Sequence, residues 1–280
     1  MTLSVNTNFG AMIALQNLSK TNARLEEVQR QISTGLKISS PKDNGAIWAI
    51  AQGMRSKVAG YEVVKQSLDR GTSVVDVAIV AAESISDLLI EMKETALAAT
   101  DRSLDQQSRN ALNETFVQLR DQIKTIIGNA EFNGINMIKS GGDSLSVLAN
   151  DDGSNRIEFA AEDLSYGPPG GPGTNIILSE DATISDFVNA DTAITEIESS
   201  IDNVGAVLAR LGSASRRLEI QRSFTDKLTD VLERGIGNLV DADLAKASAE
   251  LQALQVKQQL GIQALSIANR TPQILLGLFR

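Results

Sequence analysis

The residues best suited to bind a metal ion lie in one short acidic run. Asn150–Asn155 reads Asn-Asp-Asp-Gly-Ser-Asn, and Glu158 follows it. A calcium loop of the EF-hand type needs oxygen ligands at alternate positions and a glutamate at the twelfth, and this run has neither. Asp-Gly is a common hairpin turn, and short alternating apolar segments flank it at 145–148 and 156–159. We therefore interpret the run as the turn of a β-hairpin.

A second acidic pair, Asp241 and Asp243, could also suggest a metal site. Both residues stand immediately before a segment with helical apolar periodicity that begins at Leu244. Aspartate is favoured at a helix N-cap and in the first turn, because its carboxylate accepts unpaired amide N–H groups and complements the helix dipole. We interpret the pair as an N-cap and a first-turn acid.

Two residue types that are common in active sites are absent, since the chain has no cysteine and no histidine. Without cysteine there can be no disulfide, thiolate nucleophile or zinc–sulfur site. Without histidine the chain lacks the usual general base near neutral pH and the commonest metal ligand. The sequence therefore predicts no enzymatic activity and no cofactor.

The charge balance argues against nucleic acid as a partner. The chain carries 26 Lys and Arg against 35 Asp and Glu, a formal net charge of −9, whereas phosphate contacts need a basic face. The densest arginines, Arg210, Arg216, Arg217 and Arg222, interleave with leucine and glutamate, as on a solvated helix face. No apolar run approaches the roughly 20 residues that span a bilayer, so we expect no membrane insertion. The first eight residues lack the basic and apolar regions of a secretory signal, so we expect no cleaved signal peptide.

Long helices are the elements that must carry most of this chain. No proline lies between Pro41 and Pro168, or between Pro172 and Pro272, so two long stretches lack the strongest helix breaker. Apolar residues there and near the start recur at alternating spacings of three and four, the heptad period of coiled-coil-like packing. The segments with this period are 11–32, 47 to about 99, 112–126, 194–218 and 244–268.

The middle of the chain and its two ends have different patterns. Residues 132–184 contain glycine-rich turns and short alternating apolar runs, which predict a small β-rich insert. The terminal helical segments each span roughly 50 Å at about 1.5 Å per residue. Neither can bury its apolar stripe alone, so the simplest arrangement pairs the two ends with each other and then with copies of themselves. The predicted fold class is mainly α: a long antiparallel coiled-coil-like helical rod with a small β-hairpin or β-rich central insert.

Several short motifs resemble those of bacterial flagellins. The matching segments are Val5–Asn8, Ala14–Leu18, Ile32–Ile38, Lys42–Ala46, Phe132–Gly134, Asn238–Ala245, Gln258–Gly261, Ala264–Asn269 and Leu276–Arg280. Together they extend over roughly 1–140 and 186–280, in the family's order at both ends. The details look most like the short flagellins of alphaproteobacteria.

This resemblance implies three zones. Residues 1–35 with 240–280 would form a terminal coiled-coil core layer, residues 36–140 with 186–239 a helical rod layer with a β-hairpin, and residues 141–185 a short surface-exposed insert. The expected assembly residues are apolar side chains of the terminal helices: Leu18, Leu25, Val28, Ile32, Leu244, Leu251, Leu254, Leu265 and Phe279. In the rod layer the resemblance singles out Leu89, Glu91, Thr95, Phe132, Asn133 and Gly134.

The function that the resemblance implies is structural. The chain would polymerise, alone or with sister flagellins, into the extracellular filament of the bacterial flagellum, for swimming motility. Its other partners would be the flagellar type III export apparatus, an export chaperone and the filament cap. One alternative is the hook–filament junction protein, which shares both terminal helices. Another is an enzyme with a catalytic insert, as in rare proteolytic flagellins, but those need a His-Glu metal motif that this chain lacks.

The resemblance also bears on recognition by a vertebrate innate receptor, which binds many flagellins through a motif on the rod. The matching stretch is Leu89–Ala96, in which Glu91 and Thr95 stand where the receptor-binding pattern has basic and leucine residues. An acid in place of a base reverses the local charge, so we expect weak or absent recognition.

Overall fold

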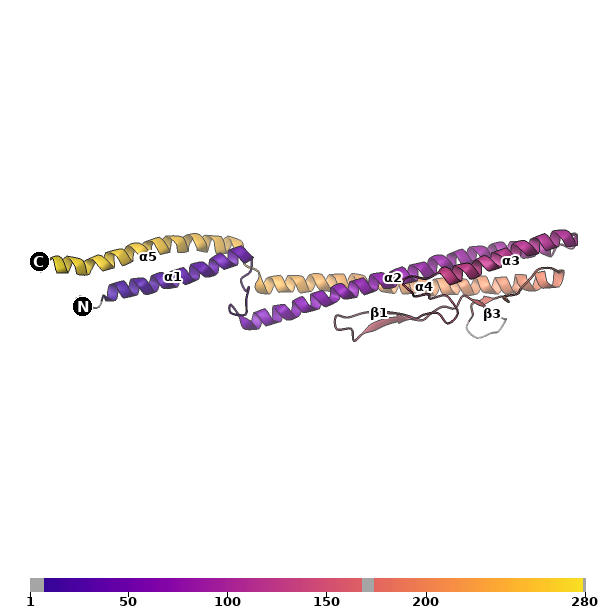
Figure 1. Ribbon diagram of the computed structural model, residues 1–280, viewed down its shortest axis with the longest axis horizontal. Helices are drawn as coiled ribbons and strands as arrows, with labels where there is room; N and C mark the ends of the chain where they lie inside the picture. Colours follow the sequence, from indigo (N-terminus) through magenta and orange to yellow (C-terminus); the bar gives the residue numbers. More distant parts are fainter. Residues whose placement is uncertain (1–7, 168–173, 279–280) are drawn as a thin grey trace. The chain divides into compact units, whose positions relative to one another are not determined.

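The chain is mainly α-helical in the computed structural model, which describes residues 8–167 and 174–278. The helices within these residues are α1 (Phe9–Thr34), α2 (Gly45–Ala99), α3 (Gln106–Asn129), α4 (Phe187–Val240) and α5 (Leu244–Leu278) (Figure 1). The strands, all between α3 and α4, are β1 (Leu145–Leu148), β2 (Arg156–Phe159), β3 (Tyr166–Gly167) and β4 (Ile176–Ile177). This order confirms the predicted mainly α fold with a small β-rich insert.

The chain folds as two compact units. Met1–Ser56 with Asp230–Arg280 forms one, here called the terminal unit, and Lys57–Thr229 forms the other, the central unit. In the terminal unit α1 and α5 lie side by side (Figure 1). The central unit combines parts of α2 and α4 with α3 and the strands around one apolar core.

In the central unit α2 and α4 run antiparallel in a constant register. Lys65 pairs with Asp226, and Asp69, four residues further along α2, pairs with Arg222, four residues back along α4. The pair Lys93–Glu198 continues this register after twenty-eight residues (93 − 65 and 226 − 198), which is four heptads. A register held over four heptads is what the apolar period predicts for coiled-coil-like packing.

A turn after α2 brings α3 back into the core of the central unit. The buried guanidinium of Arg109 donates hydrogen bonds to the carbonyl oxygens of Ala99 and Asp101. These carbonyls lie at and just beyond the C-terminal end of α2, where the helix itself supplies no N–H partners. Phe116 and Ile123 then place fully buried side chains from α3 against the core.

The strands β1 and β2 form an antiparallel hairpin, in which Leu145 lies opposite Phe159 and Leu148 opposite Arg156. In its loop, the amide of Asn155 donates to the side-chain oxygen of Asn150 over 3.0 Å. The run Asn150–Asn155 is therefore a hairpin loop, which confirms the interpretation made from the sequence. Nowhere in residues 8–167 or 174–278 do three or more acidic, His or Cys side chains group closely enough to hold a metal ion. The strands β3 and β4 make a separate parallel pair of two residues each.

The hairpin docks on α2 at two glycines. A β-carbon at Gly60 would lie 2.9 Å from the carbonyl oxygen of Asp151, and one at Gly71 would collide with the side chain of Val147. Between these contacts the amide of Leu148 donates to the hydroxyl of Ser67 over 3.1 Å. Glycine costs a helix interior about 1 kcal/mol relative to alanine. At these two positions it permits the hairpin to approach the helix closely.

The junction between α1 and α2 pairs with the junction between α4 and α5. Helix α1 ends at Thr34, and the capping residue Gly35 has a φ of 71°, in the left-handed region that glycine adopts without strain. The amide of Lys37 then donates to the carbonyl of Val240 over 2.7 Å, and the amide of Ala242 donates to the carbonyl of Gly35 over 2.9 Å. Both junctions are thus held by backbone hydrogen bonds within the terminal unit.

This pairing corrects one part of the interpretation of the acidic pair. Asp243 is the N-cap of α5, since its side chain accepts the amide of Lys246 over 3.0 Å. Asp241, however, forms an isolated antiparallel bridge with Leu36. It lies before the cap, so the prediction of a first-turn acid was wrong. The reason is that α4 continues to Val240 and the amide of Asp241 still donates to the carbonyl of Gly237 over 2.8 Å, so α5 begins only at Leu244.

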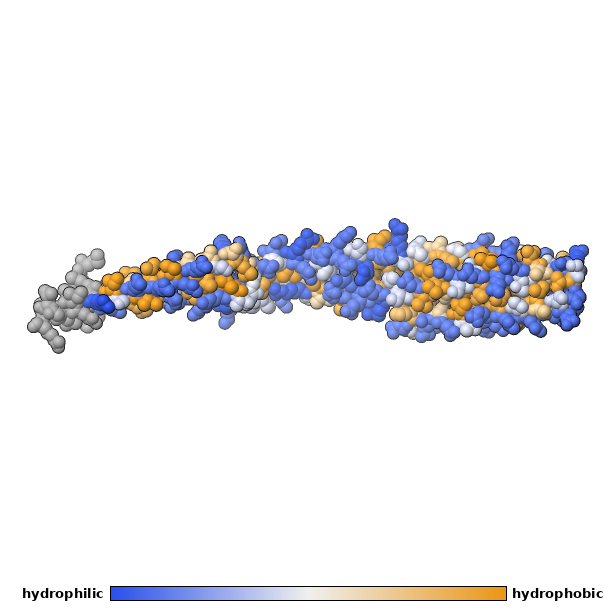
Figure 2. All heavy atoms as spheres, turned by 90° about the horizontal axis from the view of Figure 1, so that it is seen from above, coloured by the Kyte–Doolittle hydropathy of each residue, from blue (hydrophilic) through white to orange (hydrophobic). Residues whose placement is uncertain are grey.

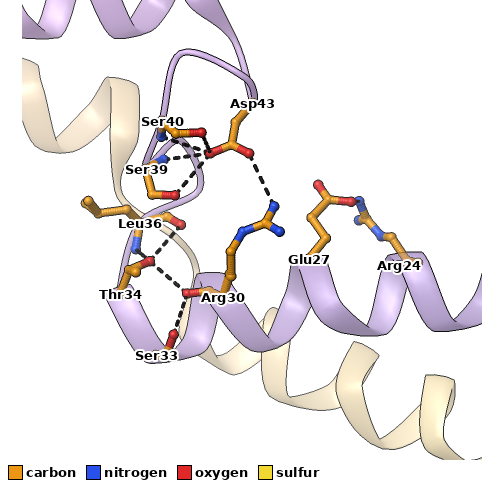
Figure 3. A network of polar contacts seen from close by, with 9 residues as sticks. All are labelled: Arg24, Glu27, Arg30, Ser33, Thr34, Leu36, Ser39, Ser40 and Asp43. Atoms are coloured by element: carbon orange, nitrogen blue, oxygen red, sulfur yellow. Dashed lines mark hydrogen bonds and ion pairs between the residues drawn. The ribbon is translucent and has the colours of Figure 1, made fainter.

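Asp43 organises the first junction (Figure 3). One carboxylate oxygen accepts the amides of Ser39 and Ser40, each over 3.0 Å, as well as both of their hydroxyls. The other oxygen pairs with Arg30 of α1 over 3.3 Å. The hydrogen bond from the backbone amide of Ser40 is the main cause that lowers the pKa of Asp43, and the amide of Ser39 and the two hydroxyls act in the same direction.

We expect Gly71→Ala to destabilise the central unit by about 1–3 kcal/mol, because the added methyl must displace the buried Val147. Gly205 in α4 is the matched control, since no atom lies within 4 Å of an added methyl there. Gly205→Ala should stabilise the unit by about 0.5–1 kcal/mol. Thermal unfolding followed by circular dichroism measures both changes. A stabilising effect of Gly71→Ala would contradict the close approach.

We expect the first junction to loosen in acid. A carboxylate whose pKa is lowered by folding contributes its full stability above its unfolded pKa of about 3.9, and loses that contribution as the pH falls through the folded pKa. Hydrogen-exchange protection of the Ser39 and Ser40 amides should therefore disappear as the pH falls through the folded pKa of Asp43. Asp43→Asn should reduce this protection already near neutral pH, whereas the control Asp87→Asn, at an exposed position of α2, should not. Equal protection in all three chains would contradict the role of Asp43.

Candidate functional site

The predicted assembly residues meet along the facing sides of α1 and α5. Leu25, Val28 and Leu254 are buried there, and Ile32 and Leu251 pack against them. We call this contact the α1–α5 seam. It also buries Ala247, so that one apolar residue per helical turn of each helix faces the other helix.

The seam continues towards the ends of the two helices. Leu18 and Leu265 are half-buried. A β-carbon at Gly261 would lie 3.2 Å from Leu18, so the two helices approach closely at this small residue. Leu244 does not take part, since it is 49% exposed at the start of α5. Phe279 lies outside the described residues, as do Val5–Thr7 of the flagellin-like N-terminal motif.

Polar contacts fix the register of the seam. The side-chain amide of Asn8 donates to the carbonyl of Ala268 over 2.7 Å, and Gln258 donates to the side-chain oxygen of Asn22 over 2.8 Å. Arg24 pairs with Glu250 over 2.7 Å and holds the pKa of that carboxyl below its usual value. An antiparallel pair of helices is therefore held in one alignment along most of its length.

Both helices carry a second apolar surface that the seam does not cover. Phe9, Met12 and Ile13 of α1 are 59–70% exposed, and at 100° per residue they lie opposite the side that faces α5. Val256 and Leu260 of α5, one turn apart, are likewise exposed on the side away from α1. We call these five residues the outer stripes, and Figure 2 shows apolar side chains along this pair of helices. Their i, i+3 and i+4 spacing was visible in the sequence, but our sequence interpretation assigned only one stripe to each helix.

The residues singled out in the rod layer have different environments. Leu89 is fully buried in the core of the central unit. Glu91 is exposed and Thr95 half-buried, with the Thr95 hydroxyl donating to the carbonyl of Glu91 over 2.9 Å. Leu89 therefore serves packing, whereas Glu91 is fully accessible and Thr95 partly accessible to a partner.

Phe132, Asn133 and Gly134 form a tight turn. The amide of Phe132 donates to the carbonyl of Ile135 over 3.0 Å, and the reverse bond measures 3.1 Å. Asn133 and Gly134 have φ values of 52° and 84°, the left-handed backbone that an Asn-Gly turn of type I′ requires. The turn follows α3 and leads the chain towards β1.

The polar hollow in the terminal unit is lined by charged side chains that already have partners within the unit. It has a volume of about 520 Å³, and its charged residues include Arg24, Asp43, Asp243 and Glu250. These side chains are engaged in the ion pairs and cap described above. Among the helices that the structure describes, none is both long and apolar enough to cross a membrane. The arrangement is suited to binding other helices along apolar stripes.

The chain is similar to known proteins over its whole length. The family model for the bacterial flagellin N-terminal helical region matches residues 5–141, and that for the C-terminal helical region matches residues 190–279. Flagellin FljM of Caulobacter vibrioides is 48% identical over 277 residues, covering 99% of this chain and 98% of the relative. A flagellin of Brucella melitensis is 34% identical over 281 residues, covering 99% of each.

A solved structure from Vibrio parahaemolyticus, described as a flagellar hook-associated protein, covers 71% of this chain and all of its own with a TM-score of 0.60. At 15% identity this likeness concerns the fold alone, so it does not favour the hook–filament junction alternative over the flagellins named above. Flagellins polymerise into the extracellular flagellar filament, and they are structural proteins and not enzymes. The chain belongs to the bacterial flagellin family and is a structural subunit of the flagellar filament.

Proposed function

We propose that the α1–α5 pair forms the innermost layer of the filament, comprising residues 1–35 and 240–280. The observation that carries this proposal is the pair of outer stripes, which remain exposed after the two helices have packed on each other. Burying a large apolar side chain stabilises by about 1.5–3 kcal/mol. No part of the same chain within the described residues covers the outer stripes. In the filament, the α1–α5 pairs of neighbouring subunits cover them.

This arrangement couples the ordering of the terminal helices to assembly. A helix pair that covers only one stripe on each helix is weakly stabilised in a free subunit, because most helical stability in proteins comes from tertiary packing. Contacts that exist only in the polymer then stabilise the folded pair by mass action. A repeated contact between two different surfaces does not close on itself and so extends into a helical filament.

The remaining zones form the outer parts of the filament in this proposal. Residues 36–140 with 186–239 make the surrounding helical layer, in which α2, α3 and α4 share a closed core. Residues 141–185 make a short surface insert, with one face of its hairpin on that core and exposed residues such as Ser146 and Glu158 on the other. So small an insert gives a slim filament with little surface decoration.

Delivery of the subunit requires partners in addition to its own copies. We propose export through the flagellar type III apparatus without a cleaved signal peptide, an export chaperone, and insertion beneath the filament cap. The outer stripes support a chaperone, because apolar surfaces of this kind promote aggregation if they are left uncovered before assembly. The absence of cysteine is compatible with export as an unfolded chain, since no disulfide can form on the way.

Leu260→Gln tests the outer stripes directly. The residue is 57% exposed and lies away from the seam, so the substitution should leave the folding of the free subunit unchanged. The lost burial in the polymer, about 1.4 kcal/mol, should raise the critical concentration for seeded elongation roughly tenfold. Sedimentation of filaments grown from wild-type seeds measures this concentration. Leu254→Gln, within the seam, is the comparison, since it should also weaken the α1–α5 pair of the free subunit.

Removal of residues 244–280 is the stronger form of the same test. The truncated chain keeps the whole central unit and should be secreted without forming filaments. Normal filaments from this chain, or an unchanged critical concentration for Leu260→Gln, would contradict the proposed inner layer.

We also propose that the subunit is a weak ligand of the vertebrate innate receptor. Glu91 presents an acid on the exposed surface where the recognised pattern has a base. The double change Glu91→Arg with Thr95→Leu should raise receptor activation by purified subunits about tenfold or more, since a like-charge contact costs several kcal/mol. Glu94→Arg makes the same charge change at an exposed neighbouring position and should have little effect. Strong activation of a receptor reporter line by the unaltered subunit would contradict the proposal.

A further inference from the structure

The central unit carries an apolar hollow between α2 and α3. It has a volume of about 450 Å³ and is lined by Val77, Val80 and Ala81 of α2, by Ile126 of α3 and by Ala130 just after that helix. Val80 is 62% exposed even though it lies among these apolar side chains. Figure 2, which looks onto α2 and α3, shows apolar side chains gathered over these helices.

The hollow has a defined length and one charged end. Asp76, Val80 and Ser84 lie one helical turn apart along its α2 side, so the hollow extends over about 12 Å at 1.5 Å per residue. The rest of its rim is neutral and polar: Gln122, Thr125 and Asn129. Asp76 is exposed, and it forms no ion pair with any residue in the described ranges.

A matching surface lies on another helix of the same unit. Arg216, Ile220 and Phe224 of α4 also lie one turn apart, over the same length of about 12 Å. Ile220 is 62% exposed and Phe224 57% exposed. Arg216, unlike Arg210 and Arg222, makes no ion pair within the described part of the chain. We call Arg216, Ile220 and Phe224 the α4 stripe.

We infer that the α4 stripe of one subunit binds in the α2–α3 hollow of a neighbouring subunit. In this contact Arg216 faces Asp76, Ile220 packs on Val80, and Phe224 lies at the Ser84 end. An apolar helix face with anchors at i and i+4 is the usual occupant of a groove between two helices. The inference rests on the polymerisation of the chain, and it goes beyond the proposed role of the terminal helices.

Three features favour a second copy of this chain as the occupant. Asp76, Val80 and Ser84 of the hollow follow one another at intervals of four residues, and so do Arg216, Ile220 and Phe224 of the stripe. The charges at the matching ends are opposite. Finally, hollow and stripe are different surfaces that every subunit carries, so each copy can offer one to either neighbour, and the contact repeats without closing.

Charge reversal distinguishes this contact from any effect within one chain. Asp76→Arg and Arg216→Asp should each slow seeded elongation about tenfold, because each variant places like charges together at every interface. An equal mixture of the two variants should elongate close to the wild-type rate, since opposite charges meet again at every interface when the two variants alternate. The chain that carries both substitutions should recover in the same way.

Lys227→Asp is the matched control, because it makes the same kind of charge change beyond the other end of the α4 stripe, three residues after Phe224. By itself it should elongate at the wild-type rate, because Asp76 and Arg216 are unaltered. The chain that carries both Asp76→Arg and Lys227→Asp should stay slow, because its Arg216 still meets the reversed charge at every interface. Circular dichroism of each free variant shows that folding is unchanged. Wild-type elongation by either Asp76→Arg or Arg216→Asp, or slow elongation by both their mixture and the double variant, would overturn the inference. Neither result bears on the test of the inner layer, which uses residues of α5 in an otherwise unaltered chain.

Discussion

A pair of long helices cannot bury two apolar stripes on each helix, and this constraint governs how the subunit works. The α1–α5 seam uses the side of α1 that carries Leu25 and Val28, and it leaves Phe9 and Ile13 exposed on the opposite side. A third or fourth helix would be needed to cover that side, as in helical bundles. The described residues of the terminal unit contain no such helix alongside this pair. In the proposed inner layer, other subunits complete its packing.

The central unit meets the same constraint within one chain. There α2 and α4 run antiparallel, α3 returns along them, and the hairpin covers a further part of the core. Phe116, Leu164 and Ile176, from α3 and the insert, are fully buried in consequence. The central unit thus closes its main core within one chain, whereas the α1–α5 pair leaves the outer stripes exposed, which neighbouring subunits cover in the proposed inner layer. This division allows a stable subunit to remain competent for polymerisation.

The helices were largely predictable from the sequence, because their period and the lack of proline act locally. The predicted segment 47 to about 99 corresponds to α2, Gly45–Ala99. The segment 194–218, in contrast, covers less than half of α4, which continues to Val240. The apolar period is interrupted there by Thr225 and Thr229, which are nevertheless buried. Each hydroxyl donates to a carbonyl one turn earlier, so a polar residue can occupy a core position without an unpaired group.

Contacts between distant parts of the chain were not predictable in this way. The docking of the hairpin at Gly60 and Gly71 depends on two helical glycines whose partners follow about 75–90 residues later. The bridge between Leu36 and Asp241 joins two junctions at opposite ends of the sequence. Within the candidate site, the heptad period predicted the seam. It did not predict the outer stripes, because a period that identifies one apolar side of a helix carries no information about a second.

The polar contacts of the seam connect these observations. A purely apolar heptad seam tolerates a shift of one helix by seven residues, since the same types of side chain meet again. Such a shift would separate Asn8 from Ala268 and Gln258 from Asn22, and it would break the pair Arg24–Glu250. The position of one outer stripe relative to the other depends on this register. A subunit whose seam had slipped by seven residues would therefore present a different surface to its neighbours. A regular filament requires equivalent copies. The polar contacts select the one alignment that makes all copies equivalent.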